Sequence, residues 1–192
     1  MHEILNISDN EISSLLSQQT ISPQYPWATN DLQEIEKFFK FIILELERKS
    51  HVKSRVEWGH YGSGYASFVD AWLYRESADF DAKYRPTHGK SYAGLVVLLS
   101  RLSPYFVLLE GEKSWDGNGG SSYLPQFDAI DAFQTLSVAE LAEQVQPILE
   151  GHGLIRLSHS MLDEPLNPKF HVPTVLTDRA FTLFDAFFYW ED

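Results

Sequence analysis

Cysteine is absent from this sequence of 192 residues. Its absence excludes disulfides, thiol nucleophiles and thiolate zinc sites, and it fits a reducing compartment. Long apolar runs are absent too, because the longest, Leu95–Leu99 and Tyr105–Leu109, fall far short of the roughly 20 residues of a membrane-spanning helix. Residues 1–20 are polar and lack the basic start and apolar run of a secretory signal. We therefore expect a cytoplasmic protein without membrane contact.

Basic residues are scarce in the second half of the chain. Residues 102–192 contain 14 Asp and Glu against four Lys and Arg, whereas residues 1–101 contain 13 against 11, so ten of the 12 net negative charges lie in the second half. An acidic surface attracts basic partners and repels nucleic acid, whose binding needs clustered lysine and arginine. The charge distribution favours a basic protein partner and disfavours DNA or RNA.

Apolar residues are plentiful although they are not contiguous. Hydrophobic residues make up 44% of the chain and aromatic residues 14%, which is enough to build a core and argues against disorder. No repeat, linker or low-complexity segment divides the chain. We expect a single domain over residues 1–192.

Two capping boxes and two apolar patterns predict four helices. In each box a serine accepts from first-turn amides while a glutamate three residues later reaches back, as Ser8 and Glu11 or Ser137 and Glu140 could do. The second predicted helix is the strongest and begins after Thr29 or Asn30, whereas the fourth is aromatic on nearly every side and is interpreted as a core or interface helix. The predicted helices span Ser8–Gln19, Asp31–Lys49, Ser137–Glu150 and Asp178–Trp190.

Between these helices the pattern changes to β-branched and aromatic residues, which are typical of strands. The apolar pair Tyr92–Arg101 and Tyr105–Trp115, separated by a short turn, predicts a hairpin at the centre of a sheet. A helix over Leu95–Leu102 is the alternative, but Gly94 and the following Ser-Pro favour a strand. Loops are expected at Glu76–Gly89 and at Asp116–Asp131, which begins with the glycine-rich residues 117–120. The other predicted strands are Val52–Trp58, Tyr65–Tyr74 and Leu154–Leu157. The fold class predicted is α+β, a mostly antiparallel sheet packed by three or four helices.

Short catalytic and metal motifs are incomplete in this sequence. Gly89-Lys90-Ser91 resembles the end of a phosphate-binding loop, but Tyr84 stands where the earlier glycine belongs. Ser63 lies directly between two glycines, whereas a nucleophile elbow places its glycines two residues away on either side. His159 and Asp163 could share a helical face, yet a metal site needs further ligands. We expect no cofactor and no metal.

One acidic residue lies within an aromatic strand. Asp70 alternates with Phe68 and Trp72, so its carboxyl group could be desolvated and have the raised pKa of a general acid. The alternative interpretation is that a nearby cation such as Arg75 neutralises it, or that it lies at a sheet edge. Asp185 in the aromatic terminal segment poses the same question.

The candidate site is a set of acids interleaved with aromatic residues at and beyond the end of the predicted central hairpin. Aromatic anchors surrounded by charge are typical of protein interfaces, and complementary charge accelerates association. The alternative interpretation is that the acids only keep the protein dispersed in water and that Trp115 covers the core. The predicted partner-binding residues are Glu110, Glu112, Trp115, Asp116, Tyr123, Asp128 and Asp131.

The chain resembles the bacterial immunity proteins that neutralise toxins delivered by contact-dependent or type VI secretion systems. The resemblance is one of general character, carried by Leu99–Tyr105 leading into a predicted strand and by the aromatic segment Leu183–Asp192. It implies a cytosolic α+β domain without catalysis of its own, bound to a cognate and basic toxin whose active site it occludes. No binding residue is carried over from the resemblance, and the oligomeric state is left open.

Two other functions remain open at this point. An enzyme with dispersed carboxylates, such as a small hydrolase, would place several acids around a deep pocket. A structural subunit of a larger assembly would instead expose the aromatic terminal segment as an apolar patch.

Overall fold

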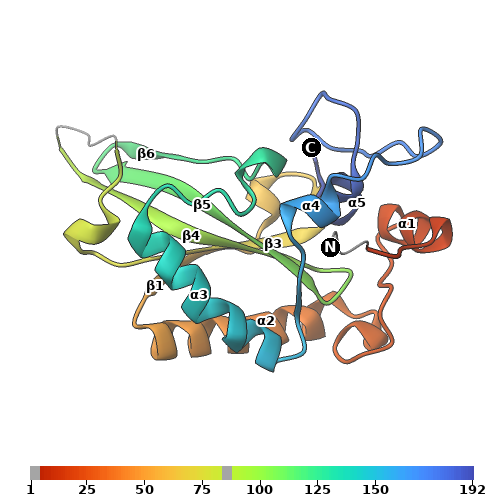
Figure 1. Cartoon of the computed structure of the whole chain (residues 1–192), viewed down its shortest axis with the longest axis horizontal. Coiled ribbons are helices and arrows are strands. Elements are labelled where there is room, and N and C mark those ends of the chain that lie inside the picture. Colours follow the sequence, from red (N-terminus) through yellow and green to blue (C-terminus); the bar gives the residue numbers. More distant parts are fainter. Residues whose placement is uncertain (1–4, 84–87) are drawn as a thin grey trace.

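A computed structural model describes residues 5–83 and 88–192 (Figure 1). Five strands form an antiparallel sheet in the order β1-β3-β4-β5-β6, and a short strand, β7, pairs in parallel with β5. The expected α+β class is confirmed, with the sheet curled into a half-barrel. The strands are β1 (Lys53–Glu57), β3 (Phe68–Tyr74), β4 (Lys90–Ser100), β5 (Tyr105–Asp116), β6 (Gly119–Ser122) and β7 (Ile155–Arg156).

The central hairpin is the pair β4 and β5, as the apolar pattern predicts. Its strands pair from Leu99 opposite Phe106 to Lys90 opposite Trp115 without interruption. Residues 95–99 of β4 are buried on both faces of the sheet, which explains why they are continuously apolar rather than alternating.

Each face of the sheet carries its own core because side chains alternate along a strand. Odd-numbered residues of β3 and β4, such as Val69 and Val97, pack against the long helices α2 (Leu32–Ser50) and α3 (Leu136–Gly151). Even-numbered residues, such as Trp72 and Val96, belong to the second core. The helices on that side are α1 (Asp9–Leu16), α4 (His159–Leu162) and α5 (Leu183–Phe187), seen above and beside the sheet in Figure 1.

The second face is concave. The guanidinium of Arg55 on β1 lies 3.7 Å from the ring centre of Trp115 on β5, although β3 and β4 separate these strands. The two side chains can meet only if the sheet curls toward them. The indole of Trp72 lies between the two strands, in edge contact with Trp115 at a centroid distance of 6.1 Å.

Helices α1 and α2 confirm the predicted positions closely. Ser8 and Glu11 form the expected capping box, and α2 covers the predicted span. The expected entry into α2 from Thr29 or Asn30 is wrong by one or two residues, because Asp31 is the N-cap residue and accepts from the Gln33 amide at 2.8 Å. A one-turn 3₁₀ helix, η1 (Trp27–Thr29), precedes it.

The second predicted capping box is wrong. Helix α3 begins at Leu136, so Ser137 lies inside its first turn rather than at the N-cap, and Thr135 makes no side-chain cap. The start of α3 is instead stabilised by Glu110 of β5. Pro147 lies within α3 and does not end it.

The predicted terminal helix Asp178–Trp190 is wrong in extent. Only α5 is helical, and strand β8 (Trp190–Glu191) follows it and pairs with β2 (Tyr65–Ala66). A segment that is apolar on every side can be helix, strand or irregular when it is fully buried, so its pattern does not identify a helix. Phe184, Phe187 and Tyr189 are buried in the second core. These aromatic residues are therefore core residues.

The predicted loop through residues 116–131 contains regular structure. Its glycines build a tight turn into β6, and the 3₁₀ helix η4 (Phe127–Ala129) follows. In the other predicted loop, η3 (Ala78–Phe80) forms one turn, whereas residues 84–87 lie outside the described residues. A further 3₁₀ turn, η2 (His60–Gly62), joins β1 to β2.

Across residues 5–83 and 88–192, no helix combines the length and the apolar character that crossing a membrane requires.

Candidate functional site

The predicted site residues on β5 are divided between the two faces of the sheet. Glu110, Glu112 and Asp116 are even-numbered and lie on the α3 side, whereas Trp115 is odd-numbered and lies on the concave side. Strand alternation therefore separates the tryptophan from its neighbouring acids. Charge and aromatic surface do not form one patch here.

An acidic pocket of about 470 Å³ lies beside β5, where the chain leaves β6. We call it the β5 pocket. Four predicted residues line it, together with Lys83, and the exposed side chain of Leu124 adds apolar surface. The four are Glu110, Glu112, Tyr123 and Asp128. The structure thus brings together more than half of the predicted set.

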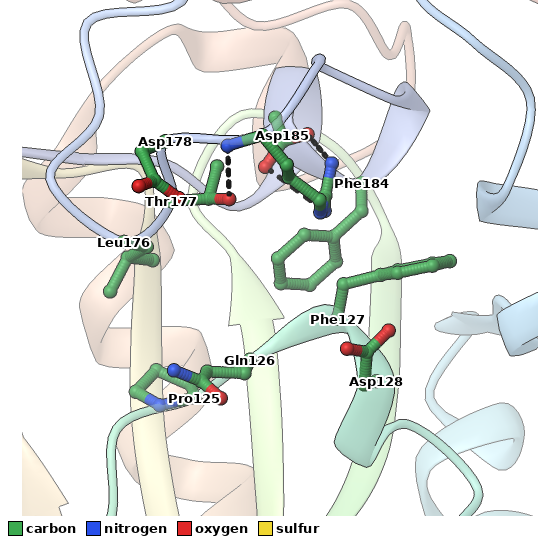
Figure 2. Close-up of a pocket in the computed structure, with 10 residues that line it drawn as sticks. Pro125, Gln126, Phe127, Asp128, Leu176, Thr177, Asp178, Phe184 and Asp185 are labelled. Carbon is green, nitrogen blue, oxygen red and sulfur yellow. Dashed lines mark hydrogen bonds and ion pairs between the residues drawn. The ribbon is translucent and has the colours of Figure 1, made fainter.

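A second, smaller pocket of about 230 Å³ lies between η4 and the loop before α5, and we call it the η4 pocket (Figure 2). Asp128 and Asp178 stand on opposite sides of it, with Phe127 and Phe184 between them in Figure 2. Arg179 is the one basic residue that lines it, and it is neutralised by Asp185, which also lines the pocket, at 2.9 Å. The η4 pocket is therefore net acidic.

Asp128 lines both pockets. It is exposed, and it makes no ion pair or hydrogen bond within the part of the chain that the structure describes. Gln126 is the other residue common to both pockets, so η4 and the residue before it form the ridge between them. Together the pockets are lined by five acidic and two basic residues.

Glu110, which lines the β5 pocket, has a structural role at the start of α3. Its carboxylate accepts from the Gln134 amide at 2.7 Å, the Thr135 amide at 3.0 Å and the Thr135 hydroxyl at 2.6 Å. These donors lie at the start of α3, where unpaired amides and the helix dipole favour a negative charge. Glu110 therefore acts as the missing cap of α3 from a different element.

Asp131 is also engaged inside the protein. Its carboxylate pairs with Arg156 at 2.6 Å and accepts from the His159 amide at 3.0 Å. Asp116 is exposed, and it accepts from the Asn118 amide at 2.7 Å in the turn before β6. Neither residue lines the two pockets.

The few basic residues of the second half are all engaged internally. Arg156 pairs with Asp131, Arg179 with Asp185, and Lys169 with Asp9. Lys113 donates to Ser122 at 2.7 Å, and its partial burial lowers the pKa of its ammonium group. None of these four basic residues forms an ion pair with the exposed pocket acids Asp128 and Asp178.

Trp115 belongs to an aromatic cluster on the concave face. It contacts Trp72, Tyr74 and Tyr92 at centroid distances of 5.8–6.1 Å, and Arg55 covers its ring. The side chain is half-buried. The geometry fits a residue that covers the core.

Asp70 is buried on the concave face, with only 4% of its surface exposed. Its oxygens accept from the Tyr123 hydroxyl at 2.5 Å and the Tyr61 hydroxyl at 2.6 Å. Burial raises the pKa of the Asp70 carboxyl, and the two tyrosine hydrogen bonds partly oppose that rise. Asp70 is therefore desolvated, as one of the two interpretations of the sequence expected. Arg75 is not the partner of Asp70, because Arg75 donates to the Ser50 carbonyl and to Gln144.

Both tyrosines are constrained by this carboxylate. Burial and the neighbouring Asp70 raise the pKa of the Tyr61 and Tyr123 hydroxyls, which therefore stay protonated as donors. Tyr61 has a left-handed backbone with φ of 56°, unusual for a residue with a side chain. Since both Asp70 oxygens are occupied, the group is held as an anchor.

Asp185 and His159, which were also singled out in the sequence, have local partners. Asp185 is buried and caps α5 by accepting from the Thr182 amide at 2.7 Å. The imidazole of His159 stacks on Phe127 at 4.2 Å. Among the described residues, no three His, Cys, Asp or Glu side chains are grouped to hold a metal ion.

Sequence reasoning missed two contributors to the pockets. Leu124 is 56% exposed beside Tyr123, and a leucine following an aromatic residue gave no sign of exposure. Asp178 comes from a segment predicted to be helix, and only the tertiary fold brings it opposite Asp128. The acidic character of the segment around Asp178 was the one feature of the sequence that could have indicated its place at the pocket.

No protein-family model, curated protein or solved structure matches the chain. Its function is therefore inferred from its own residues.

Proposed function

We propose that this chain is a binding protein that captures a basic protein on the face formed by the β5 and η4 pockets. As the resemblance to bacterial immunity proteins implies, the partner would be a toxin whose active site is occluded. The observation that carries the proposal is Asp128, an exposed carboxylate that has no partner among residues 5–83 and 88–192 and that lines both acidic pockets. Uncompensated charge of one sign speeds the encounter with a partner of the other sign.

The chemistry of the pockets supports binding better than catalysis. Asp70, whose carboxyl has a raised pKa, is covered by Tyr61 and Tyr123 rather than presented to a substrate. Glu110 is committed to the start of α3. Asp128 and Asp178 have no partner within the described residues, and the residues that line the η4 pocket with them include no histidine, lysine, serine or cysteine that would form an acid–base pair or act as a nucleophile.

The alternative of a structural subunit is supported less. It relied on an exposed aromatic terminal segment, but Phe184, Phe187 and Phe188 are buried within this chain.

The test is recovery of the partner from the native host on the immobilised protein, followed by elution in a salt gradient. We expect a stoichiometric basic protein from wild type, and loss of that protein from the Asp128→Lys/Asp178→Lys variant. The matched control is Glu140→Lys/Glu143→Lys, which makes the same charge change on exposed residues of α3 outside both pockets. Equal elution of the two variants, or no basic protein at all, would contradict the proposal.

A further inference from the structure

The two edges of the sheet are protected very differently. At one edge, β1 carries Lys53, Arg55 and Glu57, and the Ser54 amide and hydroxyl both donate to Glu47 of α2, at 3.2 and 2.7 Å. Charged side chains and a covered amide are devices that block the addition of another strand. The β1 edge is therefore protected against pairing with another strand.

The other edge, β6, has none of these devices. Its sequence is Gly-Gly-Ser-Ser, all four residues are exposed, and no strand of residues 5–83 and 88–192 pairs with its outer side. It has no charge, no proline and no bulky side chain. An open edge of this kind is a template for pairing with an extended segment.

The hydrogen-bonding pattern shows which groups are offered. Amides that bond to β5 reach its even-numbered carbonyls, as Tyr123 does with Glu112 at 3.2 Å and Asp131 with Leu108 at 3.0 Å. Ser121 is paired with Ser114, so its amide faces β5, and the amides of Gly120 and Ser122 face outward. These two residues can bond to an added strand.

The charges beside β6 select the chemistry of that strand. Glu112 and Asp116 lie on the α3 side of β5, on either side of the residue paired with Ser121, and the β5 pocket with Asp128 begins where β6 ends. Alternate side chains of an added strand would project over this acidic side. Lysine or arginine at those positions would lie against the acids.

We propose that the outer edge of β6 binds an extended segment of a basic partner protein by strand addition, with cationic side chains at alternate positions facing the β5 pocket. This rests on the proposed function and deepens it, because it specifies how the partner is bound. Main-chain hydrogen bonds would supply the register, and the acids would select the sequence.

The test uses a blocked edge and defined peptides. Ser122→Pro removes an outward amide, while Ser122→Ala controls for loss of the hydroxyl that accepts from Lys113. The probe is an eight-residue capped peptide of alternating lysine and threonine. One control peptide has the same composition with its lysines in adjacent pairs, and a second replaces lysine by glutamate.

We expect the alternating lysine peptide to slow amide exchange at Gly120 and Ser122 and to bind more tightly than either control. Ser122→Pro should weaken its binding about tenfold, and Ser122→Ala by less than about twofold. Equal binding of the two lysine peptides, or no effect of Ser122→Pro, would overturn strand addition but leave the charge-reversal test of the acidic face standing.

A second copy of the chain is the other possible occupant of this edge. Light scattering would then show a wild-type dimer that Ser122→Pro converts to a monomer while Ser122→Ala does not, which would overturn the assignment of a basic segment. Spectra of folded protein for both Ser122 variants are the control for unfolding.

Discussion

The hydroxyl of Tyr123 donates to the carboxylate of Asp70 at 2.5 Å, across the two central strands of the sheet. Tyr123 directly follows β6 at the β5 pocket, whereas Asp70 lies in β3 on the concave face. The segment that shapes the acidic pockets is therefore fixed by a buried carboxylate on the opposite side of β5. Changes on the concave face should be felt at the proposed binding face.

Loss of the Tyr123 hydroxyl should destabilise the protein. In Tyr123→Phe, Tyr61 is the one donor left to Asp70 among residues 5–83 and 88–192, and a buried carboxylate that lacks a hydrogen bond costs about 1–3 kcal/mol. We expect the free energy of unfolding in urea to fall by that amount. Tyr25→Phe is the control, because Tyr25 is 63% exposed, and an equal effect of both variants would contradict the anchoring role of the bond.

Asp70 should make stability depend on pH. Its pKa is raised in the folded protein above the ordinary value of 3.8, so the native state holds this proton more tightly than the unfolded chain. The contribution of Asp70 to wild-type stability should therefore fall as pH rises from about 4 through its folded-state pKa. In Asp70→Asn this contribution is absent, and the variant should gain stability relative to wild type over the same range.

The measurement is urea unfolding at a series of pH values for wild type, Asp70→Asn and the exposed control Asp178→Asn. Parallel pH profiles for wild type and Asp70→Asn would show that burial does not perturb this carboxyl.

Gly111 provides the space in which the Tyr123 ring lies. A Cβ at this position would meet a ring carbon of Tyr123 at 2.3 Å, and the bond to Asp70 keeps that ring from moving away. Gly111→Ala should lower the free energy of unfolding by about 1–3 kcal/mol. A Cβ at Gly117 meets nothing within 4 Å, so Gly117→Ala should have little effect, and a reversed order would contradict this packing.

Glu110 should contribute more to stability than an ordinary surface acid. Glu110→Ala leaves the Gln134 and Thr135 amides without their acceptor and should cost about 1–2 kcal/mol in thermal or urea unfolding. Glu143→Ala, on the exposed side of α3, should change stability by less than about 0.5 kcal/mol. Similar values for both would exclude Glu110 as the cap of α3.

Local patterns predicted the elements whose two sides differ or whose burial is complete. Helix α2 has an apolar and a charged side, so its pattern predicted its position. The hairpin β4–β5 was predicted because Gly94 and the Ser-Pro turn favour strands over a helix. The prediction of a helix over Asp178–Trp190 was wrong because aromatic residues on every side, as around Phe187, show no hydrophobic periodicity that distinguishes helix from strand. Strand β6 was missed because glycine and serine are typical of loops, and these residues form a strand through their pairing with β5.

The candidate site could be predicted only as a region. Acidity placed Glu112, Tyr123 and Asp128 near one another, and they line one pocket. Sequence alone could not reveal that Glu110 and Asp131 have internal partners, since those partners lie 20 or more residues away. Their role in binding a partner stays a prediction.

The sheet divides the interior into two cores, so residues that are consecutive in the sequence can pack in different cores. Val96 and Val97 share a peptide bond, yet Val96 packs in the core of Phe187 and Val97 in the core of Phe39. Truncating either valine would loosen a different body of the protein. A pair of such changes should therefore combine almost additively, as if the residues were far apart.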